Sequence, residues 1–516
     1  MSANINPIDD KPSGDVMHLE AMRSPADGEE DLKHPGLGQV VKLTPEEEAR
    51  VKVIKRKIDL RMIAIVVIYI MNQLDRSNMP AARLKGFQSD LKMTDAQYST
   101  TISILYVGYI IAQVPSNLLL NWCGRPSFYL PFWMMCWGAV SACTGVVTSF
   151  QGAVLCRFFL GFAEAPLFPG ALFLLSRWYT REELGKRVTG LWMANFISNA
   201  LNGLISAGIL AGTEGKLGHR GWRWLFWIDG GMTVLIAFLT IPILPDFPHN
   251  DRWLSASDRA LAQKRLTLET GEADDDAQLS AARVAWLCIT DPKAWLFVFS
   301  LFGQGVALSF QQFFPTLLIV KTLGYDATKT LLLTAPPWVL AGIVAYVNAY
   351  VSDKRGRRFE HLIGPYCVAI IGFIIAATTT ATAPRYISMF LMAIANAGYL
   401  LNFPWISAVF PRPPAKRAAV LAMVNSLGNL GTVAGSYVFP TKWGPSYAKT
   451  WAIMCACFVF GILMLLVLRM WFARLNRKMD KGLYVLGEDG NVRPNDALDG
   501  SHVAVNENLM AWRYQL

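Results

Sequence analysis

The chain has 516 residues, of which 53% are hydrophobic and 17% charged, and its formal net charge is +10. A soluble protein usually carries about 25% charged residues. The positive charge does not indicate nucleic acid, because the basic residues gather at alternate ends of apolar runs, as membrane topology requires. Composition therefore favours an all-α membrane protein over a soluble enzyme, with no nucleic-acid partner, cofactor or metal.

Apolar runs of about 20 residues recur along the chain. This length crosses roughly 30 Å of hydrocarbon at 1.5 Å per residue. One such run could be a buried helix of a soluble core, but a long series of them could not. We predict about twelve membrane-spanning helices, at residues 59–78, 97–120, 127–148, 152–176, 188–211, 224–244, 294–319, 331–351, 361–382, 386–410, 418–439 and 450–472.

Polar segments flank and divide these spans. The acidic region before residue 43 predicts no regular structure. The sequence Thr44-Pro45-Glu46-Glu47 is a capping box with proline at the first helical position, so we expect a short helix through Arg56 along the membrane surface. The long middle loop contains an amphipathic stretch, Ala256 to Glu269, and an acidic turn, Glu272 to Asp276.

The middle loop divides the spans six and six. The expected parts are a cytoplasmic tail with a surface helix (1–57), a six-helix bundle (58–245), a cytoplasmic central loop (246–293), a second six-helix bundle (294–473) and a cytoplasmic tail (474–516). Basic residues are dense on the side of both tails, within segments 55–57, 177–187, 354–358, 412–417 and 474–478. The positive-inside rule therefore predicts a multi-pass protein of the cell membrane with both termini cytoplasmic.

Five ionisable residues lie inside the predicted spans of the first half: Asp75, Arg76, Arg157, Glu164 and Asp229. Each is costly in hydrocarbon, so each should face a partner or a water-filled cavity. The six histidines are expected in tails or loops, so carboxylates must carry any proton chemistry inside the membrane. A purely structural ion-pair cluster is the alternative for Asp75 and Glu164, and Asp229 is expected mainly to support packing.

Helical rise gives the expected depth of these charges. Asp75 should lie roughly 5 Å and Arg157 roughly 8 Å from the outer surface, so that the two can pair, with Glu164 roughly 18 Å deep. Glu164 is seven residues from Arg157 and shares its helix face. A carboxylate near the midplane is a natural proton carrier, because burial disfavours its charged form.

Uncharged polar residues recur on spans of both halves. They favour a polar central cavity, although hydrogen bonding between helices explains any one of them equally well. Pro166, Pro169 and Gly170 should loosen the fourth span near the midplane, which is tolerated where a helix lines a cavity. The polar residues are Tyr106, Tyr109, Asn195, Asn199, Asn202, Asn402, Trp405, Asn425 and Asn429.

The loop after span 8 reads Asp353-Lys354-Arg355-Gly356-Arg357-Arg358 and resembles the D-R-x-G-R-R signature of the major facilitator superfamily. In the corresponding loop after span 2, only Gly124-Arg125 matches this signature, and Asn121 stands where an Asp is expected. An ordinary basic cytoplasmic loop is the alternative. The Asp can cap a neighbouring helix while the basic residues meet lipid headgroups. We predict a gating loop of Asp353, Arg355, Gly356 and Arg357.

Further motifs resemble one family of that superfamily, the anion:cation symporters, and most closely the fungal allantoate permease branch. The similarity covers about residues 55–475. That branch includes carriers of allantoate, nicotinate, pantothenate and related carboxylates. The motifs are residues 74–78 (LDRSN), 113–117 (QVPSN), 157–161 (RFFLG), 164–165 (EA), 168–170 (FPG) and 221–224 (GWRW).

The resemblance implies a role for each candidate residue. Asp75 and Glu164 would carry protons. Arg76 would bind the substrate carboxylate, and Arg157 would join this site and pair with the acidic residues. Further substrate contacts would come from Tyr109, Asn199, Trp405 and Asn425.

Together these patterns predict a two-bundle major facilitator fold that works as a monomer by alternating access. Its function would be proton-coupled uptake of a small organic anion across a fungal plasma membrane. A proton and an anion together would neutralise the cavity, so the loaded carrier could reorient cheaply. The alternatives are an exporter of a secondary metabolite on the same fold and a nutrient sensor of transporter ancestry.

Overall fold

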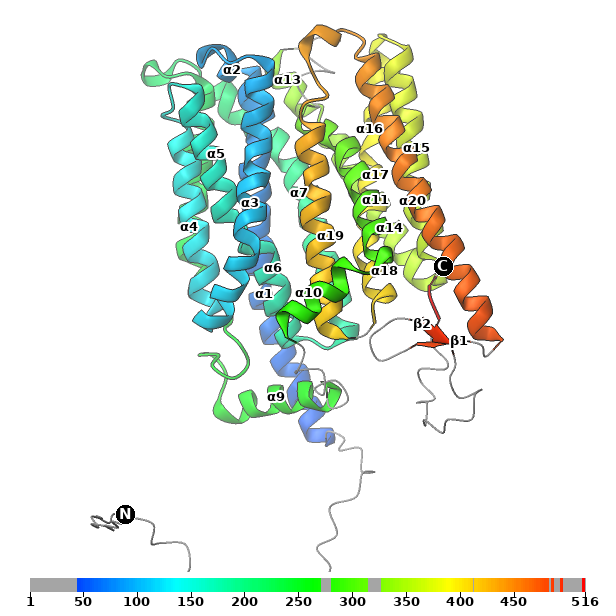
Figure 1. The fold of residues 1–516 in the computed structure, drawn as a ribbon. Coiled ribbons are helices and arrows are strands. Elements are labelled where there is room, and N and C mark those ends of the chain that lie inside the picture. The colour runs from blue at the N-terminus through cyan, green and yellow to red at the C-terminus, as the bar shows by residue number, and fades with distance from the viewer. Residues whose placement is uncertain are drawn as a thin grey trace, which may run out of the picture. The chain divides into compact units, whose positions relative to one another are not determined.

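The computed structural model describes residues 44–270, 280–313, 326–411, 413–481, 484–486, 492–494 and 513–515. The predicted acidic turn and the end of the seventh predicted span lie outside these residues. Within the unit Leu43–Leu516, long helices run side by side between two ends (Figure 1). We call the end at which the first long helix begins the tail end, and the opposite one the far end.

The first half of the chain supplies six helical crossings. Short helices α2 (Phe87–Asp90) and η1 (Lys216–Gly218) join them at the far end. The crossings are α1 (Pro45–Leu84), α3 (Asp95–Cys123), α4 (Pro126–Thr144), α5 with α6 (Phe150–Glu164, Leu167–Trp178), α7 (Arg181–Thr213) and α8 (Gly221–Thr240).

The second half supplies six more. These are α11 with η3 (Pro292–Leu308, Ser309–Gln312), α13 with α14 (Ala327–Leu332, Ala335–Arg355), α15 (Arg358–Thr378), α16 to α18 (Thr382–Ala393, Ala395–Tyr399, Asn402–Val409), α19 (Pro414–Gly435) and α20 (Ala448–Asp480). The short helix η5 (Thr441–Trp443) follows α19.

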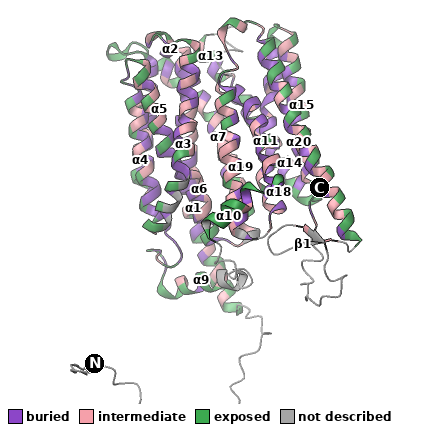
Figure 2. Ribbon diagram, in the orientation of Figure 1, coloured by how far each residue is buried: buried purple, intermediate pink, exposed green. Residues whose placement is uncertain are grey.

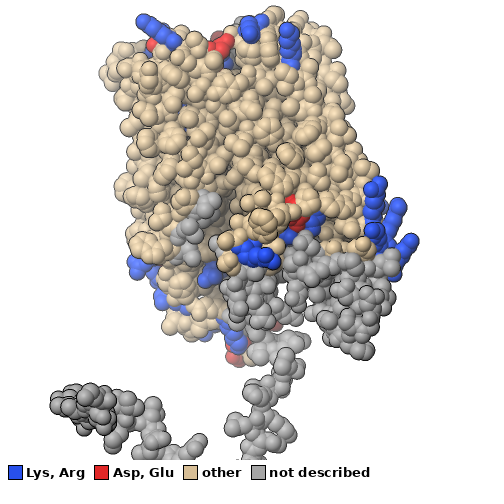
Figure 3. Space-filling model, in the orientation of Figure 1, with Lys and Arg blue, Asp and Glu red and all other residues tan. Residues whose placement is uncertain are grey.

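Nine of these crossings are long and apolar enough to span a membrane by length and composition, within the residues that the structure describes. The remaining three are α1, α3 and α4, which lie beside them in Figure 1. Uncharged surface separates clusters of Lys and Arg at the two ends (Figure 3). The predicted all-helical, multi-pass fold is confirmed.

The two halves repeat the same packing. In the first half α1 packs on α7, α3 on α5, and α4 on α8; in the second α11 packs on α19, α14 on α17, and α15 on α20. Buried residues lie mainly where helices face one another (Figure 2). Large apolar side chains such as Leu235, Phe238, Ile343 and Ile371 stay exposed. An exposed apolar surface of this kind suits lipid rather than water.

Glycine permits one of these close contacts. A β-carbon on Gly161 of α5 would collide with the carbonyl oxygen of Leu105, and one on Gly108 of α3 with that of Phe158. The backbones of α3 and α5 therefore approach more closely than helices with side chains at these positions could. This contact fixes α5, which carries Arg157 and Glu164.

Helix α1 differs from two expectations, the separate surface helix and the position of Asp75. The predicted surface helix through Arg56 is instead the first part of α1, which continues without interruption from Pro45 to Leu84, with the predicted capping box at Thr44. Because α1 extends beyond Asn78, Asp75 lies nine residues before its end, or roughly 14 Å at 1.5 Å per residue, and not 5 Å.

The central loop contains two helices in the residues that the structure describes. The predicted amphipathic stretch forms α9 (Ala256–Thr270), followed by α10 (Ala281–Ile289). Ion pairs fasten α9 to α1: Arg50 to Asp258 at 2.6 Å, and Lys264 to Glu47 at 2.7 Å. His361, expected in a loop, lies in the first turn of α15.

The region after α20 has structure that the sequence did not suggest. Strands β1 (Tyr484–Leu486) and β2 (Val492–Pro494) pair antiparallel. Tyr514 is buried and stacks on Phe472 of α20, with ring centroids 4.4 Å apart. Its backbone amide donates to Asn476 Oδ1 at 3.0 Å. This segment therefore packs against the tail end of the second bundle.

Candidate substrate and proton site

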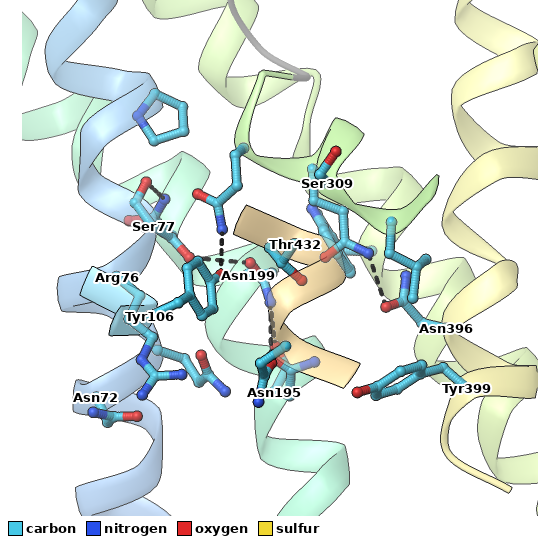
Figure 4. Close-up of a pocket in the computed structure, with 18 of the residues that line it drawn as sticks. Asn72, Arg76, Ser77, Tyr106, Asn195, Asn199, Ser309, Asn396, Tyr399 and Thr432 are labelled. Atoms are coloured by element: carbon cyan, nitrogen blue, oxygen red, sulfur yellow. Dashed lines mark hydrogen bonds between the residues drawn. The ribbon is translucent and has the colours of Figure 1, made fainter. Parts of the chain in front are cut away.

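A polar cavity of about 210 Å³ lies between the two bundles. Residues of α1, α3, α5 and α7 line it on one side, and residues of α11, η3, α14, α17 and α19 on the other (Figure 4). Side-chain amides dominate its wall: Asn72, Gln73, Asn195, Asn199, Asn202, Gln311, Gln312, Asn396, Asn425 and Asn429. Such a wall can donate and accept many hydrogen bonds to a polar solute.

One ion pair supplies the charges of the described cavity wall. Arg76 Nε donates to Glu164 Oε2 at 2.5 Å, and the two side chains are 18% and 0% exposed. The Arg76 guanidinium also lies 4.7 Å from the ring centroid of Tyr109. The other carboxylate oxygen, Glu164 Oε1, is buried and has no hydrogen-bond partner in the described part of the chain. The cavity is therefore neutral while both groups are ionised.

Glu164 is placed by a break in its span. It is the last residue of α5, and α6 resumes at Leu167. Pro166 has no amide hydrogen for the carbonyl four residues earlier and its ring crowds that carbonyl, so the helical hydrogen bonding is interrupted here although the backbone of Ala165 and Pro166 keeps helical angles. The loosened turn predicted around the prolines thus lies directly at the cavity wall.

The structure brings together five of the predicted site residues. Arg76, Tyr109, Glu164, Asn199 and Asn425 all line the cavity. They come from α1, α3, α5, α7 and α19, so both bundles contribute. A solute in this cavity would therefore touch elements that move relative to one another in alternating access.

Trp405, predicted as a substrate contact, does not line this cavity. It is fully buried in the second bundle, where its indole Nε1 donates to the carbonyl of Gln515 at 3.0 Å. Its ring packs edge-on against Phe297 with centroids 5.3 Å apart. Trp405 comes six residues after the cavity residue Tyr399, nearer the tail end.

Asp75 and Arg157 also differ from expectation, because they form no ion pair with one another in the described structure. Asp75 is fully buried and accepts from Ser141 Oγ at 2.5 Å and Thr233 Oγ1 at 3.0 Å. Arg157 is 2% exposed, and its Nε and Nη2 have no hydrogen-bond partner among described residues. Adjacent residues on a helix point about 100° apart, so Asp75 faces α4 and α8 while Arg76 faces α5.

Sequence reasoning missed several lining residues. Gln312 Nε2 donates to the hydroxyl of Tyr106 at 3.2 Å, and Gln311 Nε2 donates to Asn396 Oδ1 at 2.9 Å. Both glutamines belong to η3, the short 3₁₀ segment that ends α11. The sequence feature that could have revealed them is the polar pair Gln311-Gln312 inside an apolar run, because a buried helix that lines no cavity would not favour two adjacent polar side chains.

Aromatic rings cross between the bundles on the tail-end side of the cavity. Trp192 of α7 stacks on Phe403 of α18 with centroids 5.6 Å apart, and it meets Tyr399 edge-on at 6.3 Å. Trp192 lies nearer the tail-end start of α7 than the cavity residues Asn195 and Asn199. This contact narrows the path between the cavity and the tail end.

Hydrogen bonds close the far end. Tyr437 bonds the hydroxyls of Thr100 and Ser103 of α3 at 3.0 and 3.3 Å. Asp95, just before the predicted second span, accepts from both the amide and the hydroxyl of Thr441. Partial burial raises the pKa of Asp95, but the hydrogen bonds from Thr441 outweigh it and hold the pKa below its usual value.

The predicted gating loop stays within the second bundle in this conformation. Asp353 forms an ion pair with Arg358, and Gly356 ends α14 with a left-handed φ of 66°. Arg357 lies 3.6 Å from Glu360 in an exposed pair. The loop therefore links α14 to α15 across a turn that only glycine adopts easily.

These features define a class: a polytopic membrane transporter with a polar cavity between two six-helix bundles. Residues 64–436 match the family model described as Major Facilitator Superfamily. A match over this much of the chain means that the protein belongs to the major facilitator superfamily. It is a transporter and not an enzyme.

Individual proteins agree with this assignment. The chain is 30% identical to the MFS-type transporter cnsO of Penicillium expansum over 84% of this chain and 86% of that one. It is 31% identical to an uncharacterized transporter of Schizosaccharomyces pombe, over 84% and 89%. The solved structure of the proton:xylose symporter XylE, bound to 6-bromo-6-deoxy-D-glucose, is similar in fold, with a TM-score of 0.61 at 17% identity, covering 79% of this chain and 96% of that one.

Proposed function

We propose that this transporter is a proton-coupled symporter of a small organic anion. The observation that carries the proposal is the Arg76–Glu164 ion pair on the wall of the central cavity. A cation that recognises a carboxylate substrate is here already bound to a carboxylate of the protein. Substrate and proton therefore compete through a single contact.

The coupling follows from electrostatics. With Glu164 ionised, Arg76 is occupied and the cavity is neutral. Protonation of Glu164 removes its charge and leaves Arg76 free to bind an anion, after which the cavity is neutral again. Unpaired charge in a low-dielectric interior is costly, so the neutral empty and the neutral doubly loaded states reorient most easily. The scheme moves one proton with each monovalent anion.

The wall suggests the kind of anion. Asparagine and glutamine amides, the hydroxyls of Tyr106 and Tyr399, and the faces of Trp192 and Phe168 surround the ion pair. Such a wall suits a compact, polar carboxylate with its own hydrogen-bonding groups. The motif resemblance to the anion:cation symporter family, and to its allantoate permease branch, supports the same class of substrate.

Orientation and direction complete the proposal. The dense basic residues of the tail end support a cytoplasmic location of both termini by the positive-inside rule. Because the proton gradient across a fungal plasma membrane is directed inward, a symporter there would take up its anion. Asp353 and its neighbours would then gate the cytoplasmic side.

Transport by the purified protein in proteoliposomes tests this function. We expect an inward proton gradient to drive uptake of at least one compound from a panel of labelled small carboxylates. The double variant Arg76→Gln/Glu164→Gln, which removes both charges without leaving either unpaired, should lose it. Glu183→Gln is a matched control, because Glu183 also pairs with cations, Lys55 and Arg265, but lies outside the cavity. Uptake that survives in the double variant would contradict the proposal.

A further inference from the structure

A second buried acidic pair lies outside the cavity. Asp75 of α1 and Asp229 of α8 are 0% and 2% exposed. Each accepts a hydrogen bond from the other's helix: Thr233 of α8 donates to Asp75, and Asn78 of α1 donates to Asp229. These crossed bonds bring the two carboxyl groups against one another. The pair is therefore built into the α1–α8 contact.

No cation of the described chain forms an ion pair with either carboxylate. The titratable groups on the surrounding elements are Arg76 of α1 and Arg157 and Glu164 of α5. Arg76 is bound to Glu164. Arg157 interacts electrostatically with Asp75, but no ion pair joins them. Helix α4 contributes the neutral hydroxyl of Ser141.

Two ionised carboxylates cannot hydrogen-bond to each other, because each offers only acceptors. In direct contact away from water they also repel strongly, as in other carboxyl pairs that share a proton. The contact between Asp75 and Asp229 therefore requires a proton between them.

The charges of the whole network require the same proton. Among the described intramembrane residues of the first bundle, Arg76 and Arg157 are positive, and Asp75, Glu164 and Asp229 are negative when ionised. Full ionisation would leave one net negative charge in a low-dielectric interior, which is costly. A single proton on the carboxyl pair makes the network neutral and balances the otherwise unpaired Arg157.

We propose that Asp75 and Asp229 share one proton that remains bound to the protein throughout the transport cycle. Asp229 is then a positioning residue that sets the charge of Asp75, and Asp75 does not carry the transported proton. The consequence for transport rests on the proposed function, in which Glu164 exchanges the coupled proton. The pair itself follows from burial and contact.

A sodium ion between the carboxylates would also remove their repulsion. Ser141 and Thr233 both donate their hydroxyl hydrogens to Asp75. The observations therefore favour a proton, and sodium is a distinct outcome of the test.

Infrared spectroscopy of the purified full chain in lipid tests the pair directly. The stretching band of a protonated carboxyl group should be present in the wild type above neutral pH, where Glu164 is ionised. It should be lost in Asp229→Asn and in Asp75→Asn, each of which keeps the charge of the proton-sharing pair. Glu164→Gln is the matched control and should keep the band, because ionised Glu164 does not contribute to it.

Two results would overturn the proposal. The band could persist in both aspartate variants, or it could be absent from the wild type while sodium chloride, but not choline chloride, raises thermal stability in an Asp229-dependent manner. Transport separates this proposal from the proposed function. Asp229→Asn should keep proton-driven uptake, and loss of coupling in that variant would assign the transported proton to the pair. A wild type without any proton-coupled anion uptake would contradict only the proposed function.

Discussion

Replacing Glu164 by Gln isolates the step at which proton and anion compete. The amide has nearly the shape of the protonated acid but cannot ionise. In the wild type above neutral pH, an anion must displace Glu164 from Arg76 and leave a buried carboxylate without its counter-ion. In Glu164→Gln the guanidinium is already free of a charged partner. The variant should therefore bind the anion more tightly.

The size of this gain follows from the contact that is lost. A hydrogen bond between charged groups contributes about 1.5–3 kcal/mol net, and one between neutral groups about 0.5–1.5 kcal/mol. The Arg76 and Glu164 side chains are only 18% and 0% exposed, so solvent screening is modest. The difference of about 1–2 kcal/mol predicts anion binding roughly 5- to 30-fold tighter in the variant above neutral pH.

Paired transport assays complete this prediction. Glu164→Gln should lose accumulation of the anion under an imposed pH gradient, because the empty carrier has no proton to release. Exchange of internal for external anion, with no gradient, should survive at least in part. Anion affinity should also become independent of pH. Weaker binding that still depends on pH, or accumulation like that of the wild type, would refute the coupling role of Glu164.

Three other predictions test neighbouring parts of the account. Arg76→Gln should destabilise the protein by about 3–5 kcal/mol, because it leaves Glu164 buried without a counter-ion. Adding Glu164→Gln to this variant should restore thermal stability but not anion binding. Restored anion binding in the double variant would contradict the role of Arg76. Asp353→Asn should slow turnover while anion affinity stays constant, measured by transport rate against binding, and an unchanged rate would refute a gating role. Because the pKa of Asp95 is lowered on folding, its contribution to stability is complete above the unfolded value of about 3.9 and is lost only as pH falls through the folded value. Hydrogen exchange at Thr441 should therefore be alike at pH 5 and pH 7 apart from the intrinsic exchange rate, and Asp95→Asn should raise it at both; a wild-type opening at pH 5 would contradict this linkage.

The sequence predicted the membrane helices well because length and apolarity are strong, local signals. It also identified the charges of the first bundle, since each interrupts an apolar run. It did not predict how they pair. Span 1 was expected to end at Asn78, but α1 continues through Pro80 to Leu84, and this places Asp75 deeper beside α8. Pairing depends on helix register and rotation, which an apolar run of uncertain ends does not fix.

Breaks within spans explain the other differences. Pro166 marks the break between α5 and α6, since proline removes a helical hydrogen bond and crowds the preceding turn. Pro404, in the first turn of α18, has no amide hydrogen for the carbonyl of Leu400 and marks the break between α17 and α18, but the sequence prediction did not use it. Trp405 was expected beside the substrate, although it lies in the second bundle's core. Gln312 was missed because its 3₁₀ segment resembles the end of an ordinary helix in sequence.

The most direct test of the central claim is the number of protons taken up when the anion binds. Purified protein in weakly buffered solution above neutral pH would be titrated with the transported carboxylate while the pH is recorded. The account predicts that the wild type takes up about one proton for each anion bound, and that Glu164→Gln takes up none, because only a protonated Glu164 releases Arg76. Anion binding by the wild type without proton uptake, or undiminished proton uptake by the variant, would contradict it.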